Sequence, residues 1–181
     1  MVAIKNQCIE VEGVSDLNLQ EFYSYWNQRR GDRIAPSWSE IELIEFPARV
    51  LPYLTVVEVH RAPLDFVYTF YGTGHLVLKG RDLTGLSASL NLPEELAAVI
   101  FNQYETTLER AAPTAFRREI SDADPEVAGI PTLMDLRLPL SADGKDIHWI
   151  MSLSTLRDSP AMRNFYEAHG RARPPRKAAL A

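Results

Sequence analysis

The chain has 181 residues, of which 46% are hydrophobic and 24% charged, a composition typical of a globular protein with a core of its own. Its 19 basic and 24 acidic residues give a net charge of −5, so nucleic acid is not an expected partner. Cys8 is the only cysteine, which excludes an intramolecular disulfide and suits a reducing cytoplasm, the location we expect. The sequence shows no signal peptide and no run of ~20 apolar residues, so we expect no membrane insertion.

The N-terminal third is expected to contain one helix. Residues 1–14 have little hydrophobic periodicity and are expected to form an N-terminal extension. Residues 15–31 are typical of a helix, with a cap at Ser15 or Asp16 and a stop signal at Gly31. The apolar stripe of this helix follows three- and four-residue spacing and consists of Leu19, Phe22, Tyr23 and Trp26.

Two β-rich segments, 53–61 and 66–72, come next and are close enough along the chain to pair as a hairpin. Short helical turns are expected after Gly72. The strongest helix signal covers residues 93–112, because Pro93 suits a first turn and apolar residues recur with helical spacing.

Three segments with alternating apolar residues complete the series, at 114–120, 132–140 and 146–156. Asp143-Gly144 is a turn signal between the last two. Because the helices lie between sets of hairpin-like strands, the order predicts an α+β fold with one antiparallel sheet of five strands. Residues 161–181 carry five basic residues against one acidic residue, Glu167, and are expected to form a basic, flexible tail.

The stretch "FVYTFYGTGHLVLKGRDLTG" superficially resembles a nucleotide-binding loop. A dinucleotide fingerprint needs a third glycine where this chain has Val77, and a phosphate-binding loop needs a Gly-Lys pair that is missing here. Gly72 and Gly74 are therefore interpreted as structural residues, which allow the chain to turn sharply at the end of the strand.

The same stretch, together with "QRRGDRIAPSWSEIELIEFPARVLPYLTVVEV" and "LRLPLSADGKDIHWIM", resembles a family of bacterial single-domain PAS proteins. The resemblance covers roughly residues 22–156. It implies a PAS-like domain over 15–160: two strands, then short helices and one longer helix on one face, then three strands, with a flanking N-terminal helix.

The resemblance also implies a pocket for a small, mostly apolar ligand. Its expected lining consists of Tyr68, Phe70, His75, Leu76, Leu78, Val99, Ile100, Leu136 and Trp149. No haem or flavin is expected, because the long helix lacks a histidine and the short helices lack a reactive cysteine. No metal is expected either, because no pair of histidines has metal-ligand spacing. We expect no catalytic residues.

These observations favour a stand-alone sensory or regulatory module in signal transduction, acting through an unknown protein partner. The flanking helix, through Leu19, Phe22, Tyr23 and Trp26, is expected to form a homodimer interface. Two alternatives stay open. One is a small α+β enzyme with an apolar pocket, and the other is a transcriptional regulator that contacts DNA through the basic tail.

Overall fold

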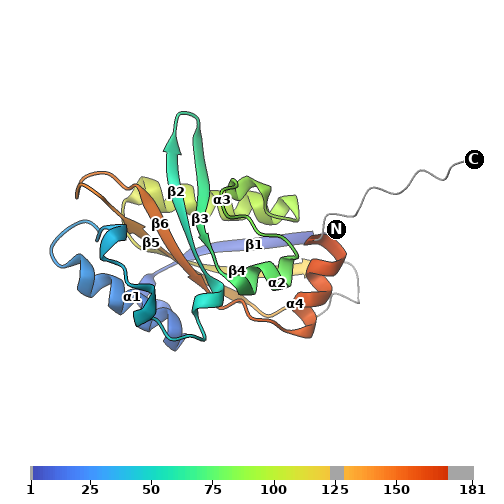
Figure 1. Cartoon of the computed structure of the whole chain (residues 1–181). Helices are drawn as coiled ribbons and strands as arrows, with labels where there is room; N and C mark the ends of the chain where they lie inside the picture. Colours follow the sequence, from blue (N-terminus) through green and yellow to red (C-terminus); the bar gives the residue numbers. More distant parts are fainter. Residues whose placement is uncertain (1, 123–128, 171–181) are drawn as a thin grey trace, which may run out of the picture.

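The computed structural model describes residues 2–122 and 129–170. Within these residues the chain is α+β, as expected, with a curled antiparallel sheet of six strands and four α-helices (Figure 1). The strand order is β1-β4-β5-β6-β2-β3. The strands are β1 (Val2–Ile9), β2 (Leu54–Arg61), β3 (Leu64–Tyr71), β4 (Thr114–Asp122), β5 (Leu133–Leu140) and β6 (Trp149–Ser154). The helices are α1 (Leu17–Arg30), α2 (Thr73–Lys79), α3 (Glu94–Arg110) and α4 (Pro160–Phe165).

The prediction of five strands missed β1, which lies in the segment expected to be an extension. This strand pairs with β4 along its whole length, from Val2 opposite Asp122 to Ile9 opposite Ala115. It forms one edge of the sheet, and side chains such as Lys5 and Gln7 are exposed. An edge strand with one solvated face has few apolar residues and so a weak hydrophobic pattern. Much of its stability comes from a partner strand more than 100 residues away, which the local sequence does not reveal.

The boundary expected for the C-terminal tail also differs. Ser159 caps α4 by accepting a hydrogen bond from the backbone N–H of Met162, and a single π-helical turn, Tyr166–Gly170, continues the helix. Phe165 and Tyr166 are buried. Residues 160–170 are therefore part of the folded domain. The rest of the predicted tail, on which the DNA-binding alternative depends, lies outside the described residues.

The predicted N-terminal helix is present as α1. The Asp16 carboxylate accepts a hydrogen bond from the backbone N–H of Leu19, and Gly31 ends the helix with a φ of 56°. Leu19, Phe22 and Trp26 are each 1% exposed, and the Trp26 indole donates to the Pro139 carbonyl oxygen at 2.7 Å. The apolar stripe therefore packs against the sheet of its own chain.

This burial changes the prediction of a homodimer interface on α1. Of the four predicted contact residues, Tyr23 alone is half-buried, while the others are already used inside the chain. Leu19, Phe22 and Trp26 therefore have little surface left for a contact with a second copy. The homodimer itself stays a prediction.

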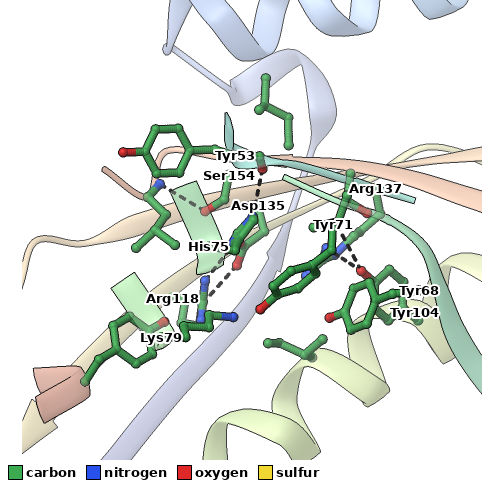
Figure 2. A pocket seen from close by; sticks show the side chains of 16 residues that line it. Tyr53, Tyr68, Tyr71, His75, Lys79, Tyr104, Arg118, Asp135, Arg137 and Ser154 are labelled. Carbon is green, nitrogen blue, oxygen red and sulfur yellow. Dashed lines mark hydrogen bonds and ion pairs between the residues drawn. The ribbon is translucent and has the colours of Figure 1, made fainter. Parts of the chain in front are cut away.

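Helices α1 and α3 cover opposite faces of the sheet (Figures 1 and 2). Directly paired residues share a face, so Arg137 of β5 and Ser152 of β6 both point toward α3. Their neighbours Leu136 and Leu153 point toward α1. None of the described helices has the length and apolarity that crossing a membrane requires.

Candidate functional site

A small, mostly polar cavity lies between the α3 side of the sheet and helices α2, α3 and the end of α4 (Figure 2). Its empty volume, including its opening to solvent, is about 400 Å³. Its polar lining consists of Tyr53, Thr55, Tyr68, Tyr71, His75, Lys79, Tyr104, Arg118, Asp135, Arg137, Ser152, Ser154 and Tyr166. The site therefore differs in chemistry from the apolar pocket that the resemblance implies.

The floor of the cavity holds a buried ion pair between β4 and β5. Arg118 donates through Nε and NH2 to the two carboxylate oxygens of Asp135, at 2.9 Å each. Burial by itself raises the pKa of Asp135, but the charges of Arg118 and Arg137 outweigh it and hold that pKa below its usual value. Asp135 is therefore ionised, as a bidentate pair with arginine requires.

Arg137 lies on the same face of β5, two residues along the strand, and is held by α3. Its Nε and NH2 donate to Gln103 Oε1 at 3.2 and 2.6 Å, and its NH1 donates to the Tyr104 hydroxyl at 3.2 Å. The Gln103 amide nitrogen in turn donates to Asn6 of β1 and to Asp135. The strand missed by the sequence analysis thus helps to orient the glutamine that positions Arg137.

Helix α2 adds two titratable groups four residues apart, His75 and Lys79, on one helix face. The His75 Nε2 lies 3.0 Å from the Tyr53 carbonyl oxygen, which assigns the proton to Nε2. Burial and the charge of Lys79 lower the pKa of His75 to about 3, so its ring is neutral.

The Lys79 amine donates to Asn91 Oδ1 at 2.9 Å, and the Asn91 amide donates to the Tyr68 hydroxyl at 3.0 Å. Burial, followed by the charges of Arg118 and Arg137, lowers the pKa of Lys79 to about 7. Lys79 thus exchanges its proton near neutral pH, which an exposed lysine does not.

Two glycines bring α2 close enough to the chain before β2 to form this wall. A Cβ placed on Gly74 would lie 2.8 Å from the Pro52 carbonyl oxygen, and one on Gly72 would meet the same backbone. Gly80 ends the helix with a φ of 66°. The packing of α2 therefore requires glycine at both positions of the junction that resembles a phosphate loop.

Three buried polar atoms of the cavity lack a hydrogen-bond partner among the described residues. These are the Tyr71 hydroxyl, Nδ1 of His75 and Oγ of Ser152. Their side chains are 8%, 6% and 2% exposed. Burial raises the pKa of Tyr71 far above its usual value, so its hydroxyl stays protonated and can donate a hydrogen bond. An unpaired buried polar atom is costly, so a molecule that binds here gains by satisfying them.

The structure brings together three of the nine predicted pocket residues. Tyr68, His75 and Ile100 line the cavity. Leu78 is buried but does not line the cavity, and Leu76 is 39% exposed.

The remaining four predicted residues lie elsewhere. Phe70, Leu136 and Trp149 belong to the face of the sheet that α1 covers, because they alternate with or pair beside residues that face α3. Val99 is half-buried on α3 and does not line the cavity. The sheet therefore separates side chains that the sequence analysis placed in one pocket.

The charged residues of the lining were not predicted, because their strand has the same alternating pattern as a strand with one face exposed to water. Asp135 and Arg137 alternate with leucines in "LMDLRLPL", and such alternation usually marks a face exposed to water. The sequence did contain one signal of this burial, the helix α3. An amphipathic helix after the first hairpin must cover one face of the sheet, and the strand residues on that face are then buried.

No family model matches this chain, and comparisons with curated proteins and with solved structures give no match. Within residues 2–122 and 129–170, no group of three or more His, Cys, Asp or Glu side chains is placed to hold a metal ion. Function is therefore inferred from the geometry of the cavity.

Proposed function

We propose that the protein is a PAS-type sensory module, which binds a small molecule in the buried cavity and signals to a protein partner. The observation that carries the proposal is the set of unpaired buried polar atoms on Tyr71, His75 and Ser152, which share one cavity. A purely structural core rarely leaves three such atoms unsatisfied side by side.

The order of elements supports the PAS assignment. Strands β2 and β3 come first, then α2 and the longer α3, then β4, β5 and β6, which is the order that the resemblance implies. Strand β1 is an addition at the edge of that arrangement.

The end of α4 offers a route for the signal. Tyr166 lines the cavity, and its ring lies 5.7 Å from the Lys79 amine. A ligand that contacts Lys79 therefore changes the surroundings of the C-terminal segment directly. Binding shifts the balance between conformations to the extent that the ligand prefers one of them.

The proposal is tested by native mass spectrometry of the gently purified protein, followed by thermal shift assays with a panel of small metabolites. Ser152→Leu fills the cavity without breaking a hydrogen bond, and Ser24→Leu is a matched control at an exposed position of α1. We expect a bound or stabilising compound that Ser152→Leu alone eliminates. Hydrogen exchange should then show altered protection of α4 when that compound binds. A protein that binds no compound, in either assay, contradicts the proposal.

A second candidate function, an enzyme, is favoured by Lys79. A buried lysine that loses its proton near neutral pH can attack a carbonyl group, releasing water and forming an imine. Borohydride reduction in the presence of a panel of ketoacids and aldehydes would trap this imine as a stable mass increase on Lys79. Adduct formation with turnover would establish the enzyme, and stable binding without turnover would favour the sensor.

A further inference from the structure

The charges of the cavity identify the class of ligand. Its lining contains three basic residues, Lys79, Arg118 and Arg137, and one acidic residue, Asp135. Both carboxylate oxygens of Asp135 accept hydrogen bonds from Arg118. Within the described part of the chain, Lys79 and Arg137 hydrogen-bond only to neutral side-chain groups. The cavity thus holds more positive than negative charge out of contact with bulk water.

Lys79 and Arg137 each have more N–H groups than the hydrogen bonds given above use. A guanidinium has five N–H groups, and Gln103 and Tyr104 receive three hydrogen bonds from Arg137. The Lys79 ammonium has three N–H groups and gives one of them to Asn91. Buried charges are costly unless an opposite charge and hydrogen bonds compensate them, so an anion is the ligand that gains most here.

Strand register aligns Arg137 with the unpaired hydroxyls. Arg137 pairs with Ser152, Ser152 with Thr55, and Thr55 with Tyr71, so these four residues form one row across β5, β6, β2 and β3. Neighbouring strands are about 4.8 Å apart, so the side chains of this row leave the same face of the sheet next to one another. The Ser152 and Tyr71 hydroxyls can both donate to an oxyanion. The row thus presents a cation together with neutral donors.

The row of hydroxyls and Arg137 offers hydrogen-bond donors to a ligand, whereas His75 offers an acceptor. Its Nε2 carries the proton that bonds to the Tyr53 carbonyl oxygen, which leaves Nδ1 as an unpaired acceptor. A bare oxyanion cannot satisfy it, whereas a hydroxyl group on the same ligand can donate to it. The cavity is small, with an empty volume of about 400 Å³ that includes its opening to solvent, which favours a short ligand.

We infer that the cavity binds a short-chain hydroxycarboxylate, whose carboxylate contacts Lys79, Arg137 and the Ser152–Tyr71 row and whose hydroxyl donates to His75 Nδ1. This inference rests on the proposed ligand-binding function and assigns its ligand class. It needs no cofactor and involves no covalent step.

Four probes separate the features of the ligand: lactate, propionate without the hydroxyl, lactamide without the charge, and inorganic phosphate. Titration calorimetry of the full chain should show binding of lactate or its shorter homologue glycolate. Propionate should bind about tenfold more weakly, and lactamide should not bind measurably. Equal binding of lactate and lactamide would overturn the assignment of an anion, and preferential binding of phosphate would overturn that of a carboxylate.

Tyr71→Phe is the sharpest variant, because it removes a hydroxyl that makes no hydrogen bond to the described residues. We expect its melting temperature without ligand to stay unchanged or rise, while lactate affinity falls about tenfold. Lys79→Gln keeps a donor for Asn91 but removes the charge, and should weaken lactate binding about a hundredfold. Arg117→Gln removes an exposed charge from the other face of β4 and should leave binding unchanged.

The failure of this inference is distinguishable from failure of the proposed function. If a neutral or cationic compound binds in the cavity and no carboxylate does, the ligand class is wrong and the ligand-binding function stands. If no compound of any class binds, both are wrong. If lactate binds equally well to Tyr71→Phe, Lys79→Gln and the unaltered protein, it binds outside the cavity and the inference fails.

Discussion

Arg118 and Asp135 form a bidentate ion pair across β4 and β5, with side chains that are 5% and 2% exposed. The pair lies beside two further buried cations, Arg137 and Lys79. Among the described residues, Asp135 is the one acidic residue of the cavity lining, so the pair compensates one of the three basic residues there.

Asp135→Asn is expected to destabilise the protein by about 3–5 kcal/mol, because Arg118 would remain buried without its counter-charge. Urea unfolding measures this loss. The matched control is Asp158→Asn, which breaks an ion pair with Arg163 on exposed surface and should have a much smaller effect. Equal effects of the two substitutions would show that the Asp135 carboxylate is not the counter-charge of the cavity.

Lys79 should make stability depend on pH on the alkaline side of neutrality. Folding lowers its pKa from 10.5 to about 7, so between these values the unfolded chain binds more protons than the folded one. Stability contributed by this group therefore rises as the pH goes from about 7 to 10.5, and it is lost as the pH falls back through this range toward 7.

This contribution is measured as the difference in unfolding free energy between the unaltered protein and Lys79→Gln at pH 7 and pH 9. The unaltered protein should gain relative to the variant at the higher pH. Other titratable groups facing Lys79 do not change charge in this window. Burial keeps His75 neutral, raises the pKa of Tyr166 to about 12 and raises that of Tyr71 far above its usual value, and the neighbouring arginine charges hold the pKa of Asp135 below its usual value. A difference independent of pH would mean that Lys79 titrates as an exposed lysine.

Gly74→Ala should destabilise the protein by about 1–3 kcal/mol, because its Cβ would press against Pro52 and the Tyr53 ring. Thermal unfolding followed by circular dichroism measures the effect. Gly13→Ala is the control, since nothing lies within 4 Å of a Cβ at that position. If both substitutions were equally mild, α2 would not pack as closely on Pro52 as the structure has it.

Phe165→Ala tests whether the C-terminal segment belongs to the folded domain. Phe165 is fully buried, so truncating it should cost about 3–5 kcal/mol in unfolding free energy. Ile44→Ala, at a side chain 89% exposed, should leave stability nearly unchanged. A mild effect of Phe165→Ala would restore the flexible tail that the basic composition suggested.

The sequence by itself determined the elements whose signals are local. Helix α1 follows its capping residue Asp16 and the spacing of its apolar stripe, and α3 follows the same spacing after Pro93. The turn at Asp143-Gly144 forms as expected, with Gly144 at a φ of 73°. The order of these elements was sufficient for an α+β fold with an antiparallel sheet, because helical and strand periodicity depend only on neighbouring residues.

Only the tertiary structure decided what covers each face of the sheet. Strand β1 exists because β4 pairs with it, and α4 is held by a few apolar side chains, Phe165 among them, within a stretch whose composition suggests solvent. The cavity depends on the same step. Arg137 has the pattern of a solvated strand residue, and it becomes a buried cation only because α3 packs over it. Burial results from contacts between distant segments, so local periodicity cannot distinguish a charge that faces water from one that faces a ligand.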